Sequence, residues 1–372
     1  MEDVNSSEEI MKRLRRIDFQ DIYYSDEDYF VKSPMNHHHL AMNVGLLDMH
    51  RRSASEWFRG RDPIERRDLG DVKYYEPSKL EEITEGFSNK NFLSRTLFGR
   101  LFRGKIHQGS ESRDVLVKTW DFYFPVKGMY EDHPARLVDE IEFVSEESKG
   151  TENLVKIVGY CFEKKLALVY NLKPKGLLRD ELCSLTFSWE SRIELAFKLA
   201  RILRSLHDKS IILGAIDASH ILIDEEYNMS LFEFGVLAKL EKGNYNTFSK
   251  DLIGIYLRHC HDCMFSGLWY MKSDVYAFGV LLMELIRGCE FDKSRHHDII
   301  SKIWSDFQQQ EVSLVNADLN QDADTCGLVT RLAVSCIAPN PDDRPDMGFV
   351  ADNLKPFLKL NQLEAKRQKT EA

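Results

Sequence analysis

The stretch SDVYAFGVLLMELIRG, residues 273–288, carries the strongest structural signal in this chain of 372 residues. Its apolar part, VYAFGVLLMELI at residues 275–286, is too short to cross a bilayer and is interrupted by Glu284. We therefore predict a helix buried in the core of a folded domain. With 43% hydrophobic and 30% charged residues, the chain can bury a large core.

The segments on the two sides of this helix differ in kind. Short runs rich in β-branched and aromatic residues predict strands at 91–97, 100–106, 114–120, 153–162 and 166–172, with a helix at 135–147 among them. After residue 176 the expected elements are mostly helices, at 188–208, 273–288, 298–309, 327–338 and 347–358. Strands and helices in separate blocks predict an α+β fold with two lobes. The small, β-rich lobe is expected at about residues 75–172 and the large, helical lobe at about 173–360.

Charge and cysteine content narrow the possible functions. The 60 acidic and 50 basic residues give a formal net charge of -10, which disfavours binding to nucleic acid or anionic lipid as the main activity. The 7 cysteines are an odd number and no secretory signal is recognisable, which predicts a reducing, cytoplasmic environment with free thiols. Cys260 and Cys263 have the spacing of a metal-binding pair, but the chain offers no second pair at zinc-site distance. We expect an ordinary loop there and no metal site.

The ends of the chain are expected to lie outside the domain, as an extension over residues 1–74 and a polar tail over 361–372. Ser6 and Glu9 have the spacing of a capping box at the start of a short amphipathic helix. Its apolar stripe either packs on the domain or docks on a partner or a membrane surface. Glu2 stands where N-myristoylation needs a glycine, and the consecutive histidines 37–39 predict a solvated loop.

Several ordered segments together resemble the eukaryotic protein kinases, specifically the plant receptor-like kinase/Pelle group. SDVYAFGVLLMELIRG is similar to that group's central large-lobe helix, and NPDDRP at 340–345 is similar to its late arginine motif. NLVKIVGYC at 153–161, LVYNLKPKG at 168–176 and SLHDKSII at 205–212 complete the match. The resemblance covers about residues 75–360 and implies a bilobal kinase fold.

A kinase needs a glycine-rich loop whose backbone amides approach the phosphates of ATP. In LSRTLFGRLFRG, residues 93–104, Ser94 and Thr96 stand at the first two glycine positions and Gly99 keeps the third. The two side chains are expected to stiffen the loop and crowd the phosphates. Lys118 matches the lysine that binds the phosphates, and Glu140 matches its partner on the following helix. This pair either serves a residual nucleotide pocket or simply holds the sheet to the helix.

The largest departures from the family lie in LGAIDASHILIDEEYNMSLFEFG, residues 213–235. Leu213, Gly214 and Ala215 stand where the family has His-Arg-Asp, so a methyl group replaces the aspartate that accepts the substrate's hydroxyl proton. His220 replaces the asparagine that binds the second magnesium ion, and imidazole is a poor partner for this cation. Glu233 replaces the aspartate of Asp-Phe-Gly, so this ligand is expected to be weakened and not abolished.

Asp217 is the one residue that could rescue the base, since positions two apart in an extended segment can face the same way. The family has a phosphate-binding lysine at this place, so a carboxylate there is expected to repel the γ-phosphate. A missing general base alone costs roughly a hundredfold to ten-thousandfold in rate.

The segment between residues 235 and 273 also departs from the family. Asp262 aligns with the glutamate that pairs with Arg344, and Gly214 replaces the arginine that reads a phosphorylated activation loop. Phosphorylation of Thr247 or Ser249 is therefore not expected to switch the domain in the usual way. By resemblance, Asp274 is a buried aspartate that braces the backbone of the catalytic loop.

These substitutions favour a catalytically inactive pseudokinase, with no cofactor and with weak or absent ATP binding. The chain resembles receptor-like cytoplasmic kinases of the ZRK type, and this resemblance implies an adaptor, scaffold or decoy in plant immune signalling. The implied partners are a receptor-like cytoplasmic kinase and a nucleotide-binding leucine-rich-repeat immune receptor, and membrane association is expected through partners. Two alternatives stay open at this point. The chain is a weak or unconventional serine/threonine kinase that uses Lys118, Glu140, Glu233 and Asp217, or an allosteric activator of an active kinase.

Overall fold

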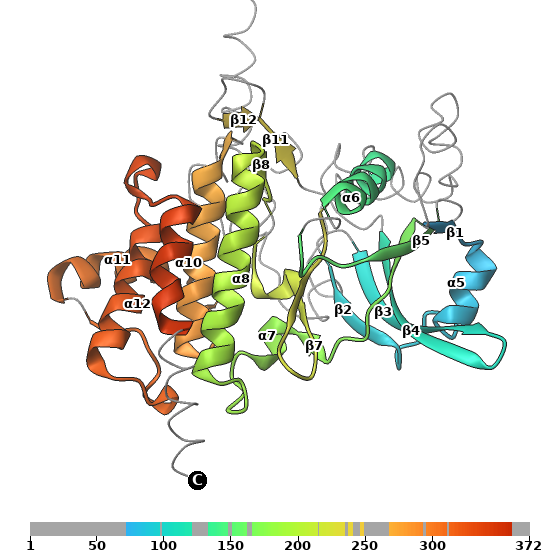
Figure 1. Ribbon diagram of the computed structural model, residues 1–372, viewed down its shortest axis with the longest axis horizontal. Coiled ribbons are helices and arrows are strands. Elements are labelled where there is room, and N and C mark those ends of the chain that lie inside the picture. The colour runs from blue at the N-terminus through green and yellow to red at the C-terminus, as the bar shows by residue number, and fades with distance from the viewer. Residues whose placement is uncertain are drawn as a thin grey trace, which may run out of the picture.

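The computed structural model has two lobes (Figure 1), the smaller one around a sheet and the larger one made mostly of helices. The residues that the structure describes are 72–96, 99–120, 133–147, 151–161, 166–214, 216–234, 237–240, 246–248, 268–292, 295–310 and 312–358. The fold confirms the α+β, bilobal class that the sequence predicts. None of the helices in these ranges is both long and apolar enough to span a bilayer.

The small lobe is built on a six-stranded sheet with the spatial order β1-β5-β6-β4-β3-β2. Its strands are β1 (Lys73–Tyr74), β2 (Phe92–Arg95), β3 (Gly99–Gln108), β4 (Glu111–Trp120), β5 (Ile157–Cys161) and β6 (Ala167–Tyr170). All neighbouring strands pair antiparallel, except that β1 runs parallel to β5. The central strands therefore lie between partners on both sides, and β4 brings Lys118 to the middle of the sheet.

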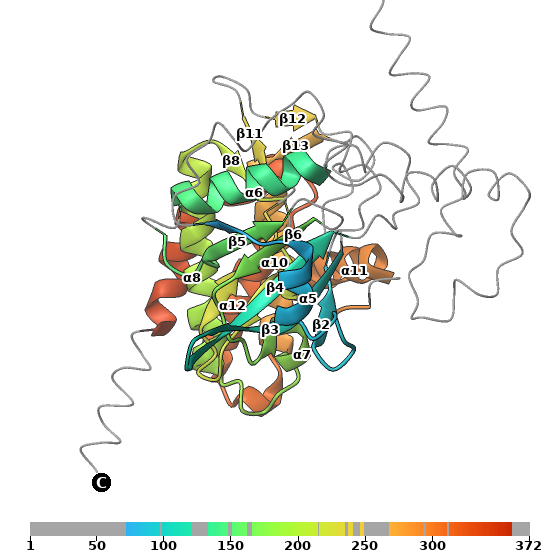
Figure 2. The same cartoon turned by 90° about the vertical axis from the view of Figure 1, so that its right-hand side faces the viewer.

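The two faces of this sheet are covered by different helices, which Figure 2 shows from the side of α5. Helix α5 (Pro77–Ile83) packs on the outer face, where it meets the odd-numbered valines of β4, 115 and 117. Helix α6 (His133–Glu147) belongs to the core on the other face, together with Leu116 and Trp120. Successive side chains of a strand point to opposite faces, so residues 116, 118 and 120 all point toward α6 and the large lobe.

A glycine allows the close approach of α5. A Cβ atom at Gly104 on β3 would lie 2.6 Å from Cγ2 and 2.9 Å from the carbonyl oxygen of Ile83, distances that real Cβ atoms do not show. This position therefore needs the absence of a side chain, because α5 packs directly onto the strand.

The large lobe is built around α10 (Met271–Arg287), the helix predicted at residues 273–288. Every residue from 273 to 286 is buried, which confirms the prediction of a core helix. It packs against α8 (Trp189–Asp208) and α12 (Ala323–Cys336), and left-handed Gly288 ends it with a φ of 73°. The outer elements are α7 (Leu178–Glu181), α11 (His296–Gln310), the short turns η5 (Ala317–Leu319) and η6 (Pro341–Asp343), and a helix over residues 347–358.

One buried cation holds α8 in place. The guanidinium of Arg192 donates hydrogen bonds to four backbone carbonyls, at residues 182, 184, 187 and 285, and also lies over the Phe187 ring. Burial lowers the pKa of Arg192 to about 10. Three of these carbonyls precede α8 and the fourth lies near the end of α10, so the side chain of Arg192 links segments that are far apart in sequence.

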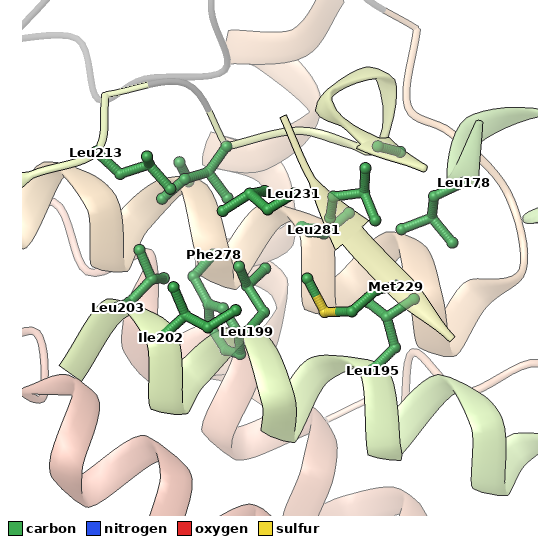
Figure 3. Close-up of a cluster of buried hydrophobic side chains, with 14 of the residues drawn as sticks. Leu178, Leu195, Leu199, Ile202, Leu203, Leu213, Met229, Leu231, Phe278 and Leu281 are labelled. Atoms are coloured by element: carbon green, nitrogen blue, oxygen red, sulfur yellow. The ribbon is translucent and has the colours of Figure 1, made fainter. Parts of the chain in front are cut away.

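Further short strands pair outside the six-stranded sheet. Strands β7 (Gly176–Leu177), β9 (Ile221–Ile223) and β10 (Met229–Leu231) form a three-stranded sheet. Two pairs complete the set, β8 (Ile211–Ile212) with β11 (Ala238–Lys239), and β12 (Asn246–Phe248) with β13 (Leu268–Tyr270). Figure 3 shows that Leu213, Met229 and Leu231 of this region lie over the leucines of α8 and next to α10. The hairpin formed by β9 and β10 is thus held by apolar packing against α8 and α10.

Three kinds of contact join the lobes on either side of the cleft. Lys209 at the end of α8 donates to Glu147 at the end of α6, with 2.6 Å between Nζ and Oε2. Leu231 forms backbone hydrogen bonds with residues 153 and 155. Arg103 on β3 donates to the Lys175 carbonyl at 3.1 Å. These contacts hold the two lobes together, and the term cleft is used for the region between them that holds the side chains of Lys118, Glu140 and Glu233.

Candidate active site

Lys118 is the centre of a buried group of charges in the cleft. The strand places its side chain on the inner face, where the ammonium lies 2.8 Å from Oε2 of Glu140 and 4.2 Å from the centre of the Trp120 ring. Neither Lys118 nor Glu140 is exposed to solvent. The pair that the sequence predicts is thus formed, and the aromatic ring adds a further favourable contact for the cation.

Glu140 is positioned by α6. It lies on the same face of this helix as Leu137, Ile141 and Val144, which follow the spacing that turns a helical stripe toward the core. Tyr170 on β6 donates a hydrogen bond to its second oxygen, Oε1. Burial and the nearby Glu140 raise the pKa of Tyr170 well above its usual range, so its hydroxyl stays a donor.

A buried ion pair costs several kcal/mol of desolvation per ion and is weak evidence for stability alone. A function that uses the ammonium accounts for the burial of Lys118 better than attachment of sheet to helix does, since an apolar pair of similar volume would serve that purpose.

The backbone of the catalytic-loop region is held by one carboxylate. The Oδ2 and Oδ1 atoms of Asp274 accept hydrogen bonds from the amides of Leu213 at 2.8 Å and Gly214 at 2.9 Å. The imidazole of His207 lies 3.0 Å from the same carboxylate. This confirms the bracing role predicted for Asp274. Gly214 has a φ of 79°, in the left-handed region that favours glycine, while Leu213 is buried in the core.

Asp217, His220 and Glu233 meet in the cleft. The short helix η2 (Ala218–His220) begins after Asp217, whose Oδ1 accepts a hydrogen bond from the Ser219 amide. Nδ1 of His220 lies 3.6 Å from Oδ1 of Asp217, and its Nε2 lies 3.4 Å from Oε2 of Glu233. Burial works against a charged imidazole, but the carboxylates of Asp217 and Glu233 outweigh it and raise the pKa of His220.

Glu233 connects this group to the lysine. Its Oε1 atom lies 3.4 Å from Nζ of Lys118, and its backbone has a φ of 70°. Positive φ in a residue other than glycine is costly and is typical of functional sites. Phe234 is fully buried and packs against Phe143 of α6. The structure thus brings Asp217, His220, Glu233, Lys118 and Glu140 into one continuous row of ionisable groups.

The phosphate-loop residues lie on the hairpin of β2 and β3. The amide of Thr96 donates to the Gly99 carbonyl at 2.9 Å, which closes the hairpin near its tip. The Ser94 hydroxyl donates to the Arg95 carbonyl and accepts from Nη2 of Arg179 on α7 at 3.3 Å. Ser94 is nearly fully buried, so its hydroxyl is engaged by the large lobe.

Some predicted residues have contacts that the sequence does not indicate, and others are not described. Arg344 donates to the carbonyls of Ala338, Lys272 and Pro339, and Thr247 lies on β12. The predictions for Ala215, Ser249, Asp262 and the two cysteines at 260 and 263 lie outside the described residues, as do those for residues 1–71 and 361–372. Sequence reasoning missed Tyr170, Trp120 and Arg179. For Trp120 the alternation of β4 was an available signal, since it shares a face with Lys118.

Two lobes with a lysine–glutamate pair buried in the cleft between them define a protein kinase fold. Residues 87–354 match the sequence profile of the family described as protein tyrosine and serine/threonine kinase, and the chain belongs to this family.

Its relatives are plant proteins. The chain is 29% identical over 349 residues to an EPD1-interacting receptor-like cytoplasmic serine/threonine-protein kinase of Nicotiana benthamiana, which covers 88% of this chain and 73% of the relative. It is 29% identical to the serine/threonine-protein kinase PBL13 and 32% identical to PBL34, both of Arabidopsis thaliana. These two matches cover 77% and 76% of this chain but 60% of each relative. The chain is therefore a homologue of plant receptor-like cytoplasmic serine/threonine kinases.

These findings correct the functional prediction from sequence. The prediction of an inactive pseudokinase that is not an enzyme is wrong, because the relatives are named serine/threonine-protein kinases. The prediction of no cofactor and weak or absent ATP binding is wrong as well, because kinases of this family use ATP and magnesium. The physical reason lies in the cleft. The exchanges at Leu213, Gly214 and His220 leave the ion pairs of Lys118 with Glu140 and Glu233 assembled.

The residues of the cleft fit ATP with a divalent cation. A buried ammonium suits phosphate oxygens, and a carboxylate next to it suits a cation that bridges those phosphates. Magnesium in phosphate-transfer sites is commonly held by one or two carboxylates together with the phosphates. Lys118 would therefore bind the phosphates and Glu233 the cation.

Proposed function

We propose that the protein is an ATP-dependent serine/threonine kinase with an unconventional and slow active site. The observation that carries this proposal is the ammonium of Lys118, held 2.8 Å from Glu140 and 3.4 Å from Glu233 in the interior of the cleft. Phosphoryl transfer depends mostly on positioning and electrostatic stabilisation, and Lys118, Glu140 and Glu233 together supply both.

Each residue of the set has a separate task. Glu140 orients Lys118, whose ammonium neutralises charge on the phosphates of ATP. Tyr170 holds Glu140 through its second oxygen. Bound at Glu233, a divalent cation supplies positive charge to the phosphates. His220 faces Glu233 and Asp217 and so keeps both carboxylates oriented within the cleft.

The proton of the substrate is assigned to Asp217, the carboxylate that follows the exchanged His-Arg-Asp position. In the reaction, the substrate hydroxyl oxygen forms a bond to the γ-phosphorus while the bond to the bridging oxygen of ADP breaks, and the hydroxyl proton passes to Asp217. Asp217 is shifted by two residues from the family's base and is already bonded to the Ser219 amide. The rate is therefore expected to be roughly a hundredfold to ten-thousandfold below that of a kinase with an intact base.

The test is transfer of labelled γ-phosphate from ATP to the protein itself and to a generic serine/threonine substrate, with magnesium and with manganese. We expect slow incorporation that is lost in Lys118→Met and strongly reduced in Glu233→Gln. Because Lys118→Met can affect folding, circular dichroism of both variants accompanies the assay.

The matched control is Lys209→Met. Lys209 also pairs with a glutamate of α6, at 2.6 Å from Glu147, but outside the row of charges in the cleft. It should retain the wild-type rate. Incorporation by wild-type protein no higher than that of folded Glu233→Gln, with either cation, would overturn the proposal.

We further propose that the protein works in the cytoplasm and associates with membranes through partners. A relative carries the words receptor-like cytoplasmic and EPD1-interacting in its name, which supports a signalling role of this kind. The predicted partners, a receptor-like cytoplasmic kinase and a nucleotide-binding leucine-rich-repeat immune receptor, stay predictions, as does placement within the ZRK type. Co-purification of the tagged chain with these two proteins tests them.

A further inference from the structure

The contact between His220 and Glu233 has the dimensions of one edge of a cation site. Two ligands about 2.1 Å from an octahedral cation and at a right angle to each other lie about 3.0 Å apart. Nε2 of His220 and Oε2 of Glu233 are 3.4 Å apart, so a movement of a few tenths of an ångström brings both into range. Both side chains are almost completely buried, which limits the positions that they can take.

Asp217 lies on the other side of the same imidazole. Its Oδ1 atom is 3.6 Å from Nδ1 of His220. A histidine that binds a metal through one ring nitrogen commonly donates the other N–H to a carboxylate, which fixes the orientation of the ring and makes it a better ligand. Asp217, His220 and Glu233 thus lie in this order, and the candidate cation position lies between His220 and Glu233.

The other oxygen of Glu233 is directed elsewhere. Oε1 lies 3.4 Å from the ammonium of Lys118, while Oε2 faces Nε2 of His220. Within the described residues no group of three or more His, Cys, Asp or Glu side chains gathers to hold a metal. Binding to His220 and Glu233 therefore needs further ligands from the phosphates of a nucleotide and from water, as is usual for phosphate-transfer sites.

The donor atoms determine which cation binds best. Magnesium prefers an all-oxygen set, whereas imidazole nitrogen favours transition-metal ions, with affinity rising from Mn²⁺ to Co²⁺. We propose that Glu233 and His220 form a mixed oxygen–nitrogen site that selects transition-metal ions such as Mn²⁺ over Mg²⁺ when ATP is bound. This inference rests on the proposed function, since the nucleotide completes the site.

The experiment measures cation binding directly. The full chain is titrated with Mn²⁺ at about pH 8 in the presence of a non-hydrolysable ATP analogue, since metal binding needs the deprotonated imidazole. Free Mn²⁺ is read by electron paramagnetic resonance, and Mg²⁺ and Co²⁺ are added as competitors. We expect affinity to rise in the order Mg²⁺, Mn²⁺, Co²⁺.

Two variants and one control separate the roles of the side chains. His220→Asn restores an oxygen ligand and should weaken Mn²⁺ binding at least tenfold while Mg²⁺ binding changes little or improves. Asp217→Asn, which leaves both ligands in place, should weaken Mn²⁺ binding about 10–100-fold through loss of the oriented ring. His107→Asn, on the exposed surface of β3, should behave as the wild type.

A spectroscopic readout does not depend on the folding of any variant. Protein labelled with ¹⁵N-histidine should show a ¹⁵N coupling to bound Mn²⁺ in pulsed electron paramagnetic resonance, which adenine of the unlabelled nucleotide cannot produce. Absence of this coupling, or an unchanged Mn²⁺ to Mg²⁺ preference in folded His220→Asn, would overturn the inference. If the coupling is present and no phosphate is transferred, the site stands and the proposed kinase activity falls.

Discussion

Replacement of Lys118 by methionine tests whether the row of charges in the cleft is coupled. Methionine keeps much of the length of the side chain and removes the ammonium. Glu140 and Glu233 are then left buried without the cation that lies 2.8 and 3.4 Å from them. An uncompensated buried charge is among the most destabilising changes in a protein.

The distances set the size of the effect. In an effective dielectric of about 20, attraction at these two separations amounts to about 6 and about 5 kcal/mol. The release of Lys118 from its desolvation cost offsets several kcal/mol of that sum. We therefore expect the free energy of unfolding to fall by about 3–5 kcal/mol, the range found when one partner of a buried pair is removed.

Chemical denaturation of the metal-free protein measures this loss. Lys118→Met combined with Glu140→Gln removes one of the stranded charges, so the double variant should be about 1–3 kcal/mol more stable than the sum of the single changes predicts. Lys209→Met serves as the control. The side chain of Lys209 is 50% exposed, and loss of such a pair costs at most about 1 kcal/mol. If Lys118→Met costs no more than Lys209→Met, the reasoning about a coupled buried row is refuted.

Three further predictions concern stability. Because the pKa of His220 is raised in the folded state, its charge stabilises the protein fully below about pH 6.5, and this stabilisation is lost as the pH rises through the folded-state pKa. Between about pH 6 and pH 9 the metal-free His220→Asn variant should therefore lose less stability than the wild type, as measured by chemical denaturation at each pH. Arg192→Met leaves four carbonyls without their donor, three of them in buried hydrogen bonds, and should lower the unfolding free energy by about 3 kcal/mol or more; a urea midpoint close to that of wild type would contradict this. Gly104→Ala should cost about 1–3 kcal/mol because its Cβ meets Ile83, whereas Gly176→Ala, with nothing within 4 Å, should be nearly neutral in the same thermal unfolding assay.

Much of the fold could be predicted from the sequence because its main elements are long and periodic. The predicted helix at 188–208 is observed as α8, Trp189–Asp208, and the one at 135–147 is contained in α6, His133–Glu147. The short strands β7, β8 and β11 were not predicted. A strand of two residues has no period to detect, and its pairing depends on segments brought together by the rest of the fold.

The sequence predicts which residues belong to the candidate site, but not which of them are in contact with one another. Lys118, Glu140 and Glu233 follow from position in the chain, but the bridge from Glu233 through His220 to Asp217 depends on how η2 turns. The hydroxyl of Ser94 is bonded to Arg179, 85 residues away. No local pattern in a sequence encodes a contact over that separation.

The functional prediction failed at a different step. It treated the exchanges at Ala215 and His220 as a loss of chemistry, residue by residue. Catalysis of phosphoryl transfer is spread over several charges, so loss of a base lowers the rate by a limited factor. The relatives named as serine/threonine-protein kinases and the assembled lysine pair both argue for that distributed account.

The anchoring of the backbone at Gly214 bears on which side chains this loop tolerates. Asp274 accepts hydrogen bonds from the peptide amides of residues 213 and 214 and does not depend on their side chains, so the loop keeps its anchor whatever side chains stand there. With a φ of 79° at Gly214, a residue with a Cβ atom pays a conformational penalty of about 1–2 kcal/mol. The anchor is thus indifferent to the side chains of this loop, whereas the backbone conformation favours glycine.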